Sequence, residues 1–422
     1  MNRPRKQNFV TRFFDSLGPG LISGAADDDP SGIATYSITG AQLGTSLLWT
    51  ALLTWPLMAA VQMMCARIGM CSGYGLAHAL RRKFPTWIVA TAALALLAAN
   101  IINIGADLSG MADAADMLTG FDSRIYVVVF GIAISAATVW LPYAKIANVL
   151  KWLALFLFSY VFTAIVVRPD WLSIVRDTFV PSLPQGKEAW ATLVAILGTT
   201  ISPYLFFWQA SQEVEEEKIQ GRITTIARRG ATDGELFMRR IDVLTGAFFS
   251  NLVMFFIIVT TAFTLHRHGI TNIETSRQAA EALRPLAGSG CFLLFTAGVI
   301  GTGLLAIPVL AGSVAYAVAE ARGWRTGLER PLAEARPFYI VIAIAIVVGI
   351  AVDFSPLDPI KALIWSAVLN GVIVVPIMVA MMIMASRRKL MGDFTASRWQ
   401  VLLGWAATAV MAAAAIAMFV LM

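Results

Sequence analysis

Long apolar runs separated by short polar or charged segments recur along the whole chain. Each run has about 20 residues or more, the length that a helix needs to cross a hydrocarbon core of roughly 30 Å. Eleven such runs are visible, with ends set to within a few residues: 17–39, 44–68, 86–118, 124–141, 147–168, 189–212, 240–265, 288–320, 337–353, 358–384 and 397–421. The pattern predicts an all-α integral membrane protein with eleven transmembrane helices.

Polar residues and a proline interrupt two of these runs. The first run contains ADDDP, ending in Asp29 and Pro30, and the sixth contains TTISP, ending in Ser202 and Pro203. Proline lacks the N–H of the helix ladder and disfavours a helical residue before it, so each helix breaks there. A good N-cap residue followed by proline also restarts a helix. We therefore expect helices 1 and 6 to be discontinuous.

The positions of the two breaks predict an internal repeat. Spans one and six are five helices apart, an odd number, so they cross the membrane in opposite directions. This matches an inverted repeat of five plus five helices with a binding site at the bilayer midplane. The predicted units are an N-terminal cytoplasmic segment, the first repeat, an extracellular loop, the second repeat, and a cytoplasmic loop with the eleventh helix: residues 1–16, 17–168, 169–188, 189–384 and 385–422.

The composition agrees with a membrane protein and excludes other classes. Of 422 residues, 58% are hydrophobic and 14% charged, which is outside the range of soluble globular proteins. The three cysteines, Cys65, Cys71 and Cys291, are dispersed and fit neither a disulfide framework nor a thiolate metal site. A net charge of +6 does not imply nucleic acid, because basic residues collect in cytoplasmic loops. The lipid bilayer is the expected partner, and no protein partner is expected to be required.

The distribution of basic residues predicts how the chain is oriented in the membrane. With the N-terminus inside, 24 of the 32 Lys and Arg residues fall on the cytoplasmic side. The others lie outside: Arg124, Arg168, Arg176, Lys187, Arg267, Arg277, Arg284 and Lys361. The positive-inside rule favours this arrangement. We expect a multi-pass protein of the inner (plasma) membrane, with a cytoplasmic N-terminus and an extracytoplasmic C-terminus.

Asp29 is the strongest candidate for a binding residue. A carboxylate in hydrocarbon costs at least a few kcal/mol and usually marks an ion pathway. The alternative is that Asp29 serves only as a helix cap, but a cap needs no more than Ser or Thr, as Ser202 illustrates. The carbonyls of Ala26 and Thr199, at the last turns of the first half-helices, are natural co-ligands for a cation. With Ser202 they form an oxygen-rich metal site suited to Mg²⁺ or Mn²⁺, and no Cys, Met or His lies beside either break in the sequence.

Four neighbouring polar residues have two interpretations each. Asp27 and Asp28 either line an aqueous mouth that concentrates cations or supply a second ligand. Tyr204 and Asn370 are either ligands or gates, or they join helices by simple hydrogen bonds.

Asp107 lies in the middle of the third span, and its alternatives are an interhelical hydrogen bond or a place in a water-filled vestibule. Asn100 and Asn103 lie at helical spacing from it and share its polar face. A proton relay would need further titratable groups along a path, and few are present.

Two loops are longer than simple connections. Residues 213–239 are strongly charged, which favours a solvated cytoplasmic loop over a cation-exit role for its glutamates. Residues 266–287 include His266 and His268, but an H-x-H pair alone is weak support for a metal site, so a solvated loop is favoured.

Two stretches resemble a known family. GPGLISGAADDDPSGIATYS is similar to the first helix of the NRAMP divalent-metal transporters, whose motif is Asp-Pro-Gly-Asn, and TTISPYLFFWQ is similar to their sixth-helix motif, Met-Pro-His. Helix count, breaks and loop pattern extend the resemblance over most of the chain. The resemblance implies the amino-acid-transporter (LeuT-type) fold and movement of Mn²⁺ or Fe²⁺, commonly coupled to protons.

By this resemblance, Asp29 matches the metal-binding aspartate and Pro30 its proline. Ala26 and Thr199 match positions that offer carbonyls, and Asp107 matches an aspartate of the third helix.

The sequence departs from the family pattern at positions that determine which ion is bound. Ser31 and Gly32 replace Gly-Asn, Ser202 replaces the methionine whose sulfur selects transition metals, and Tyr204 replaces the histidine. Gly110 stands where a glutamate is expected, and helix nine contains no arginine pair. These changes resemble the divergent magnesium-transporting branch, with a larger site for a partly hydrated ion. Mg²⁺ dehydrates reluctantly and commonly uses only one or two carboxylates.

The sequence therefore favours a transporter of Mg²⁺, with Mn²⁺ as co-substrate and no obligatory proton coupling. The alternatives are a proton-coupled Mn²⁺/Fe²⁺ importer and an organic-cation or amine transporter of the same fold. An intramembrane aspartyl enzyme would pair Asp29 with Asp107. The chain lacks the Tyr-Asp and Gly-x-Gly-Asp contexts of such enzymes, so we expect no enzyme activity and no cofactor apart from the transported ion.

Overall fold

The computed structural model describes residues 18–141, 153–182, 186–273, 275–328, 330–354, 359–392 and 394–420. The predicted N-terminal segment and residues 147–152 of the fifth predicted span lie outside this part. Regular structure in the described residues is helical throughout: α2 (Pro19–Asp27), α3 (Pro30–Leu43), α4 (Trp49–Ser72), α5 (Leu76–Arg81), α6 (Thr86–Thr119), α7 (Ser123–Trp140), η1 (Leu153–Phe158), α9 (Ser159–Val167), α10 (Trp171–Phe179), α11 (Lys187–Thr200), α12 (Pro203–Ile219), α13 (Asp233–Thr264), η2 (His266–His268), α14 (Ser276–Ala280), η3 (Glu281–Leu283), α15 (Arg284–Ala287), η4 (Gly288–Gly290), α16 (Cys291–Arg322), α17 (Arg336–Asp353), α18 (Pro359–Ala385), α19 (Arg388–Met391) and α20 (Arg398–Val420).

Long apolar helices dominate, as predicted. Within the described residues, nine helical stretches are long and apolar enough to cross a membrane, and Leu155–Val167 is a shorter apolar helix. The first predicted span is present as the pair α2 and α3. The prediction of an all-α membrane protein is confirmed.

Both predicted interruptions are present. Helix α2 ends at Asp27, and α3 begins at Pro30 with Asp29 in extended conformation as its N-cap. Helix α11 ends at Thr200, and α12 begins at Pro203. Each proline occupies the first helical position, where its missing N–H breaks no intrahelical bond.

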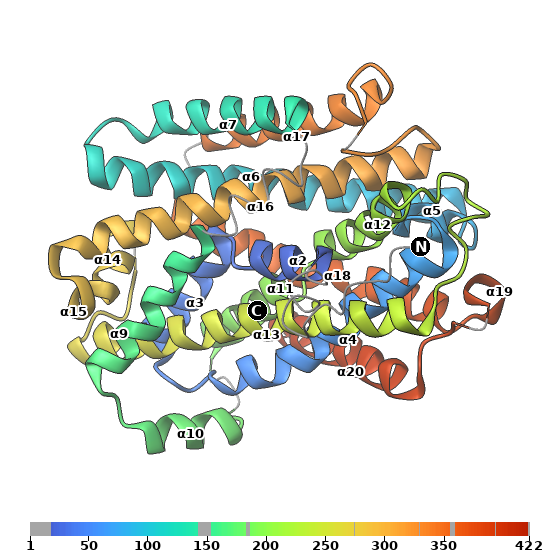
Figure 1. The fold of residues 1–422 in the computed structure, drawn as a ribbon. Coiled ribbons are helices and arrows are strands. Elements are labelled where there is room, and N and C mark those ends of the chain that lie inside the picture. Colours follow the sequence, from blue (N-terminus) through green and yellow to red (C-terminus); the bar gives the residue numbers. More distant parts are fainter. Residues whose placement is uncertain are drawn as a thin grey trace, which may run out of the picture.

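The four half-helices lie in the interior of the bundle (Figure 1). In that view α6, α16, α7 and α17 lie above them, and α4 and α20 lie below. Helix α2 packs on α13, and α11 packs on α18. Glycines allow both contacts: a Cβ at Gly24 would overlap the Gly246 backbone, and a Cβ at Gly198 would overlap the backbone at Gly371. Close backbone approach at small residues is typical of membrane helix pairs.

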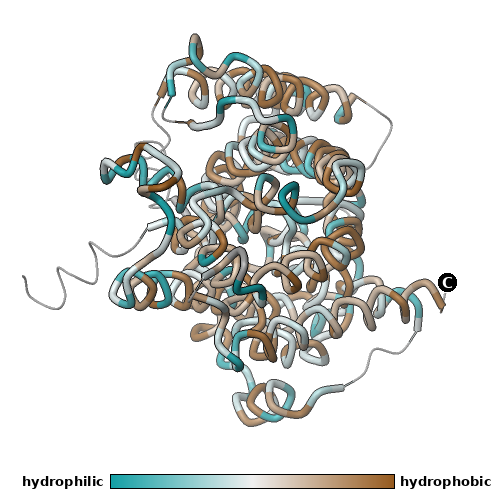
Figure 2. Tube along the Cα trace, turned by 90° about the vertical axis from the view of Figure 1, so that its right-hand side faces the viewer, coloured by the Kyte–Doolittle hydropathy of each residue, from teal (hydrophilic) through white to brown (hydrophobic). Residues whose placement is uncertain are grey.

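The interpretation of residues 213–239 as a solvated loop is wrong for both ends of the segment. Helix α12 continues to Ile219, and α13 begins at Asp233 with a capping box between Thr232 and Glu235. Glu213, Glu215 and Glu217 of α12 are buried. Basic partners from the chain around them explain the burial of these charges. Figure 2 looks onto this end of the molecule, where hydrophilic stretches lie among the apolar helices.

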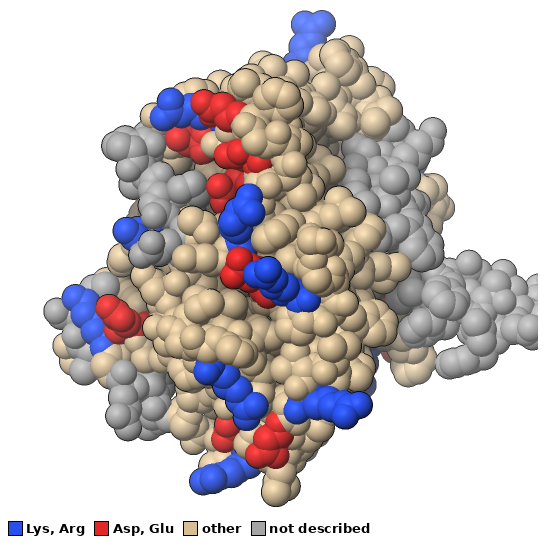
Figure 3. Space-filling view, turned by 90° about the vertical axis from the view of Figure 1, so that its left-hand side faces the viewer, with Lys and Arg blue, Asp and Glu red and all other residues tan. Residues whose placement is uncertain are grey.

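Residues 266–287 form a short-helix cap at the other end. His266 Nδ1 lies 2.7 Å from the carbonyl oxygen of Ala41, and His268 Nδ1 lies 2.8 Å from that of Thr264, so each ring contacts the backbone. In the described part, η2, α14, η3 and α15 occupy this segment, and Leu283 is fully buried. The segment is therefore more ordered than a solvated loop. Figure 3 shows this end of the molecule, where acidic and basic side chains lie close together.

Candidate metal site

Asp29 divides its two carboxylate oxygens between two structural roles. Oδ1 accepts a hydrogen bond of 2.7 Å from the backbone N–H of Gly32, which caps α3. Oδ2 accepts a bond of 3.2 Å from the side-chain amide of Asn103 on α6. The Asp29 side chain is 2% exposed, so the carboxylate lies inside the protein at the gap between two half-helices.

Tyr204 joins the two interruptions. From the first turn of α12, its hydroxyl donates to the carbonyl of Ala26 at 3.1 Å and lies 3.5 Å from Asp29 Oδ2. Ala26 lies near the end of α2, where backbone carbonyls have no partner within the helix. The structure thus brings together three of the residues that the sequence selected.

Thr199 and Ser202 lie at the second interruption, but Ser202 does not act as predicted. It occupies the N-cap position of α12 without accepting a backbone N–H. Its hydroxyl instead donates to the carbonyls of Gly198 and Thr199, each at 2.7 Å. The prediction that Ser202 caps α12 with its side chain is therefore wrong, because the hydroxyl is turned back toward the free carbonyls at the end of α11 and accepts no N–H from the first turn of α12. The Thr199 carbonyl already has this partner in the conformation described.

Gly32 lies where the two breaks approach each other closely. A Cβ at this position would lie 3.1 Å from the Asp27 carbonyl, 3.3 Å from Thr199 Oγ1 and 3.5 Å from Asp29 Oδ1. The absent side chain therefore adjoins oxygens from both interrupted helices.

A second carboxylate, Asp107 on α6, adjoins the first interruption. Its Oδ1 accepts the backbone N–H of Ser31 at 3.2 Å, whereas Oδ2 is buried without a hydrogen-bond partner in the described residues. Asn103 also belongs to this group, because Ser366 on α18 donates to its Oδ1 at 2.7 Å. Asp107 is thus adjacent to the candidate site, in agreement with its selection from the sequence.

Asp27 and Asp28 share a hydroxyl partner on α13. Ser250 Oγ lies 2.7 Å from Asp27 Oδ2 and 3.4 Å from Asp28 Oδ1. Asp27 is fully buried, and its Oδ1 has no hydrogen-bond partner in the described residues. These carboxylates face α13, away from the bonds that Asp29 makes with α6 and α12.

Acidic side chains gather at the site without basic partners in the described residues. Asp27, Asp28, Asp29 and Asp107 are all buried, and none forms an ion pair with Lys, Arg or His in the described part of the chain. Buried carboxylates are costly unless they are paired, protonated or bound to metal. Within the described residues, no three His, Cys, Asp or Glu side chains converge on one metal position. A cation here would be held by Asp29, backbone carbonyls and water.

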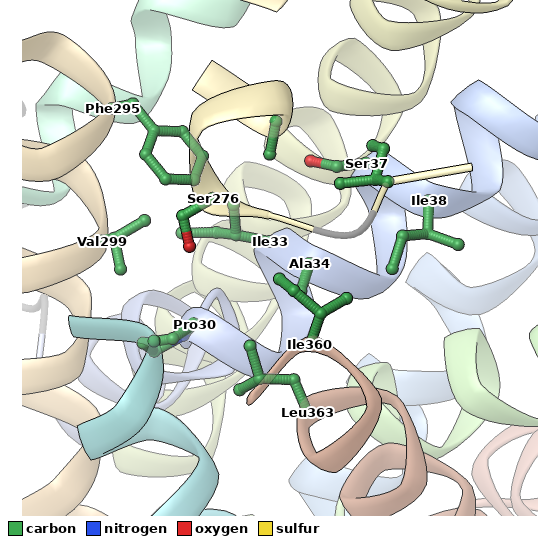
Figure 4. Close-up of a pocket in the computed structure, with 13 residues that line it drawn as sticks. Pro30, Ile33, Ala34, Ser37, Ile38, Ser276, Phe295, Val299, Ile360 and Leu363 are labelled. Carbon is green, nitrogen blue, oxygen red and sulfur yellow. The ribbon is translucent and has the colours of Figure 1, made fainter. Parts of the chain in front are cut away.

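One side of the site is covered by apolar side chains. A cavity of about 20 Å³, large enough for roughly one water molecule, lies beside Pro30. Its lining includes Leu363 from α18, Phe295 from α16 and Ser276 from α14, which surround α3 in Figure 4. The arrangement is a small, mostly apolar cavity beside the first break.

The positions of two residues, Asn370 and Met254, were not predicted from the sequence. Asn370 on α18 is buried, but no described hydrogen bond connects it to Asp29 or Tyr204, and its Oδ1 has no partner in the described residues. Met254 on α13 places its sulfur 3.9 Å from Thr200 Oγ1. A sulfur that is distant in the sequence therefore lies beside the last residue of α11, next to the second break.

Sequence reasoning missed Ser31, Ser250 and Ser366 as partners of the site. Each is a small hydroxyl residue within an apolar helix, which is common in membrane proteins and carries no specific signal. Asn103 had a signal, because it lies one turn from Asp107 on the same helix.

A multi-pass helical protein in which two interrupted helices meet at a buried carboxylate has the architecture of a secondary transporter. The model of the Nramp family, described as natural resistance-associated macrophage protein-like, matches residues 20–421. The chain belongs to this family, whose members are transporters and not enzymes.

Relatives and solved structures agree with this family assignment. The chain is 27% identical over 400 residues to the divalent metal cation transporter MntH of Caldanaerobacter subterraneus, covering 91% of this chain and 88% of the relative. It is 27% identical to MntH of Deinococcus radiodurans over 413 residues, covering 94% and 87%. The Eremococcus coleocola manganese transporter superposes with a TM-score of 0.77 at 17% identity, covering 98% of this chain and 88% of that one.

A more distant fold similarity involves a different substrate class. MHP1, a nucleobase-cation-symport-1 family transporter, superposes with a TM-score of 0.54 at 15% identity, covering 95% of this chain and 92% of that one. At these identities the solved structures establish the fold alone.

Proposed function

We propose that this protein moves divalent cations across the membrane, binding them at Asp29 between the two interrupted helices. The observation that carries the proposal is a buried carboxylate without a cationic partner in the described residues, beside the carbonyl end of α2. The negative end of the helix dipole adds to the attraction for a cation. The names of the curated relatives, divalent metal cation transporters, support the same substrate class.

The proposed ligands are Asp29 Oδ2 and the carbonyls of Ala26 and Thr199. The hydroxyls of Tyr204 and Ser202 would turn away from these carbonyls when a cation takes their place. Asp28 and Asp107 are proposed as accessory charges, and Asn370 as an accessory residue only if α18 moves toward the site.

The proposed preference is for a hard, partly hydrated ion, Mg²⁺ with Mn²⁺ as co-substrate. The oxygens that surround Gly32 support this choice, because Mg²⁺ binds through oxygen ligands. Proton coupling is proposed not to be obligatory. The nearest atoms to a side chain at Gly110 would be carbons of Leu363 and Pro30, each 3.4 Å from its Cβ.

A second candidate is a proton-coupled importer of Mn²⁺ or Fe²⁺. Its support is the Met254 sulfur near the second break, because thioether ligands favour softer metals. The manganese transporter among the solved structures has the same fold.

We further propose eleven crossings, with the broken pair α2–α3 and the helix at Leu155–Val167 added to the nine long stretches. Residues 17–168 and 189–384 would form the inverted repeats, and 385–422 would add the last helix. The chain would lie in the plasma membrane with its N-terminus in the cytoplasm.

Uptake into proteoliposomes tests the function. We expect Asp29→Asn to reduce Mg²⁺ and Mn²⁺ uptake by about 100-fold or more, because the only full charge among the proposed ligands is lost. The matched control is Asp116→Asn, which removes a carboxylate from α6 outside the site. Undiminished uptake by Asp29→Asn in a folded protein would contradict the proposal.

Transport measurements in the same vesicles distinguish the two candidate functions. A panel of Mg²⁺, Mn²⁺, Fe²⁺, Ca²⁺ and organic cations, measured with an internal pH dye, gives the ion preference and the coupling. Competition of Mg²⁺ with Mn²⁺ and no lumenal acidification are expected. Acidification that follows Mn²⁺ entry, without Mg²⁺ competition, would favour the proton-coupled importer.

A further inference from the structure

A second cavity lies far from Asp29, at the end of the molecule where α4 finishes. It has a volume of about 630 Å³ and is bounded by the ends of α4 and α18, the residues after α5, and two connecting segments. Its lining residues are Cys71, Ser72, Arg82, Lys83, Arg229, Gly230, Met384, Arg387, Met391, Gly392 and Phe394.

Four of the lining residues are basic and come from three separate parts of the chain: Arg82, Lys83, Arg229 and Arg387. None of them forms an ion pair with Asp or Glu in the described residues, and no described lining residue is acidic. Burial lowers the pKa of Lys83, and the positive charge of Arg387 lowers it further. Positive charges thus gather around one cavity without compensation from the described residues.

Backbone contacts hold the walls of the cavity in place. The N–H of Gly230 donates to the carbonyl of Cys71 at 3.1 Å, which attaches the segment before α13 to the end of α4. The guanidinium of Arg67 donates to the carbonyls of Phe394 and Thr395, each at 3.2 Å. The connection after α18 is therefore also attached to α4. These bonds position the basic residues independently of any ligand.

The cavity also has an apolar part, at Phe394. The ring of Phe394 is partly buried and packs against the core to which the buried Cys71, Met384 and Met391 belong. The cavity therefore combines cationic side chains with an apolar floor, formed by Phe394, at the ends of membrane-spanning helices. This combination matches a ligand with an anionic group joined to hydrocarbon.

We propose that this cavity binds a phosphate-bearing anion, with the headgroup of an anionic phospholipid as the favoured source. Arginine side chains bind phosphate oxygens through pairs of N–H donors, and basic pockets between transmembrane helices bind anionic headgroups. The apolar floor would contact the glycerol and the first carbons of the acyl chains. Free phosphate has the same anionic chemistry but would leave this floor uncovered.

Native mass spectrometry of the full-length protein in detergent tests the proposal. The protein is mixed with phosphatidylglycerol or phosphatidylcholine, and retained lipid is measured. We expect wild type to retain phosphatidylglycerol in preference to phosphatidylcholine. The double variant Arg229→Gln/Arg387→Gln is expected to bind phosphatidylglycerol roughly 30-fold more weakly, since each basic residue contributes separately to headgroup binding.

The matched control is Arg322→Gln/Arg325→Gln, which removes the same charge from exposed residues outside the cavity. It is expected to retain phosphatidylglycerol as wild type does. A titration with inorganic phosphate separates the sources: displacement of the lipid by millimolar phosphate, or phosphate binding without lipid binding, assigns the site to soluble phosphate. Equal retention by both double variants, with no phosphate effect, would overturn the proposal.

Discussion

At the first interruption, the oxygens of Asp29 have different freedom to bind a cation. Oδ1 accepts the N–H that starts α3, so its withdrawal would cost the cap, typically about 1 kcal/mol. Oδ2 has only the bond from Asn103 and a long contact to Tyr204. A cation that takes Oδ2 leaves the helix start intact. In the proposed site, the residue would therefore hold the break with one oxygen and bind the ion with the other.

A substitution at Gly32 tests whether the transported ion keeps part of its water when it binds. A methyl group at this position would lie 3.1 Å from the Asp27 carbonyl oxygen and 3.3 Å from Thr199 Oγ1, so it would push these oxygens apart. Gly32→Ala is therefore expected to lower Mg²⁺ uptake by about tenfold, equivalent to about 1.4 kcal/mol. Mn²⁺, which gives up water more readily, is expected to lose less. Uptake competition between the two ions measures the difference. Gly290→Ala, where the nearest atom is 3.8 Å from the new methyl, is the control, and equal losses for both ions would contradict the hydrated-ion interpretation.

At the scale of elements, the start of α2 is held by residues of other helices. Asp242 on α13 accepts the N–H groups of Gly18, Gly20 and Leu21 at 2.9, 2.8 and 3.0 Å. Arg239 forms an ion pair with the same carboxylate at 2.6 Å. It also pairs with Glu213 at 2.7 Å and with Glu216, both on α12. One guanidinium thus joins α2, α12 and α13.

Loss of Arg239 should loosen this junction. Arg239→Ala leaves Asp242 and Glu213 buried without their cation, and removal of one partner from a buried ion pair typically costs about 3–5 kcal/mol. We expect a lower thermal midpoint and faster maleimide labelling of a cysteine introduced at Ser23 on α2. Arg240→Ala removes an exposed neighbour and is expected to change neither. If the two variants behave alike, Arg239 does not hold α2.

His78, on the short helix α5, is expected to make the folding stability depend on pH. Burial lowers the pKa of His78 below its ordinary 6.5, and the charges of Arg82 and Arg81 lower it further. The folded protein therefore binds this proton more weakly than the unfolded chain does. Stability falls as pH drops through about 6.5 and levels off below the folded pKa.

The variant His78→Gln isolates this contribution. Its thermal midpoint is expected to fall less than that of wild type between pH 7.5 and pH 5.5, as measured by tryptophan fluorescence. An identical fall in both proteins would show that other groups cause the acid sensitivity.

For the molecule as a whole, features set by neighbouring residues could be predicted from the sequence, whereas contacts between helices could not. The Asp29–Pro30 and Ser202–Pro203 breaks follow from backbone chemistry within a few residues, so the sequence predicted them. The Asn103 bond to Asp29 joins residues 74 positions apart and depends on how α6 packs. The burial of Glu213 depends on Arg239, whose position relative to α12 has no local signature. Pairings of this kind require the packed bundle.

Sidedness is also a property of the whole molecule. In a background without Cys65, Cys71 and Cys291, we expect a cysteine at exposed Arg176 to react with an impermeant maleimide in intact cells. A cysteine at exposed Arg325 is expected to react only after permeabilisation. Reaction of both from the same side would contradict the proposed number of crossings or their orientation.

The first turn of α2 has no cap from its own sequence. Gly18 contributes no side chain, and its N–H and those of two neighbours depend on a carboxylate more than 220 positions away. If α13 shifts, those donors lose their acceptor together, and the turn frays from its outer end toward Asp29. Displacement of a neighbouring helix would therefore unwind the half-helix that leads to the proposed ion site.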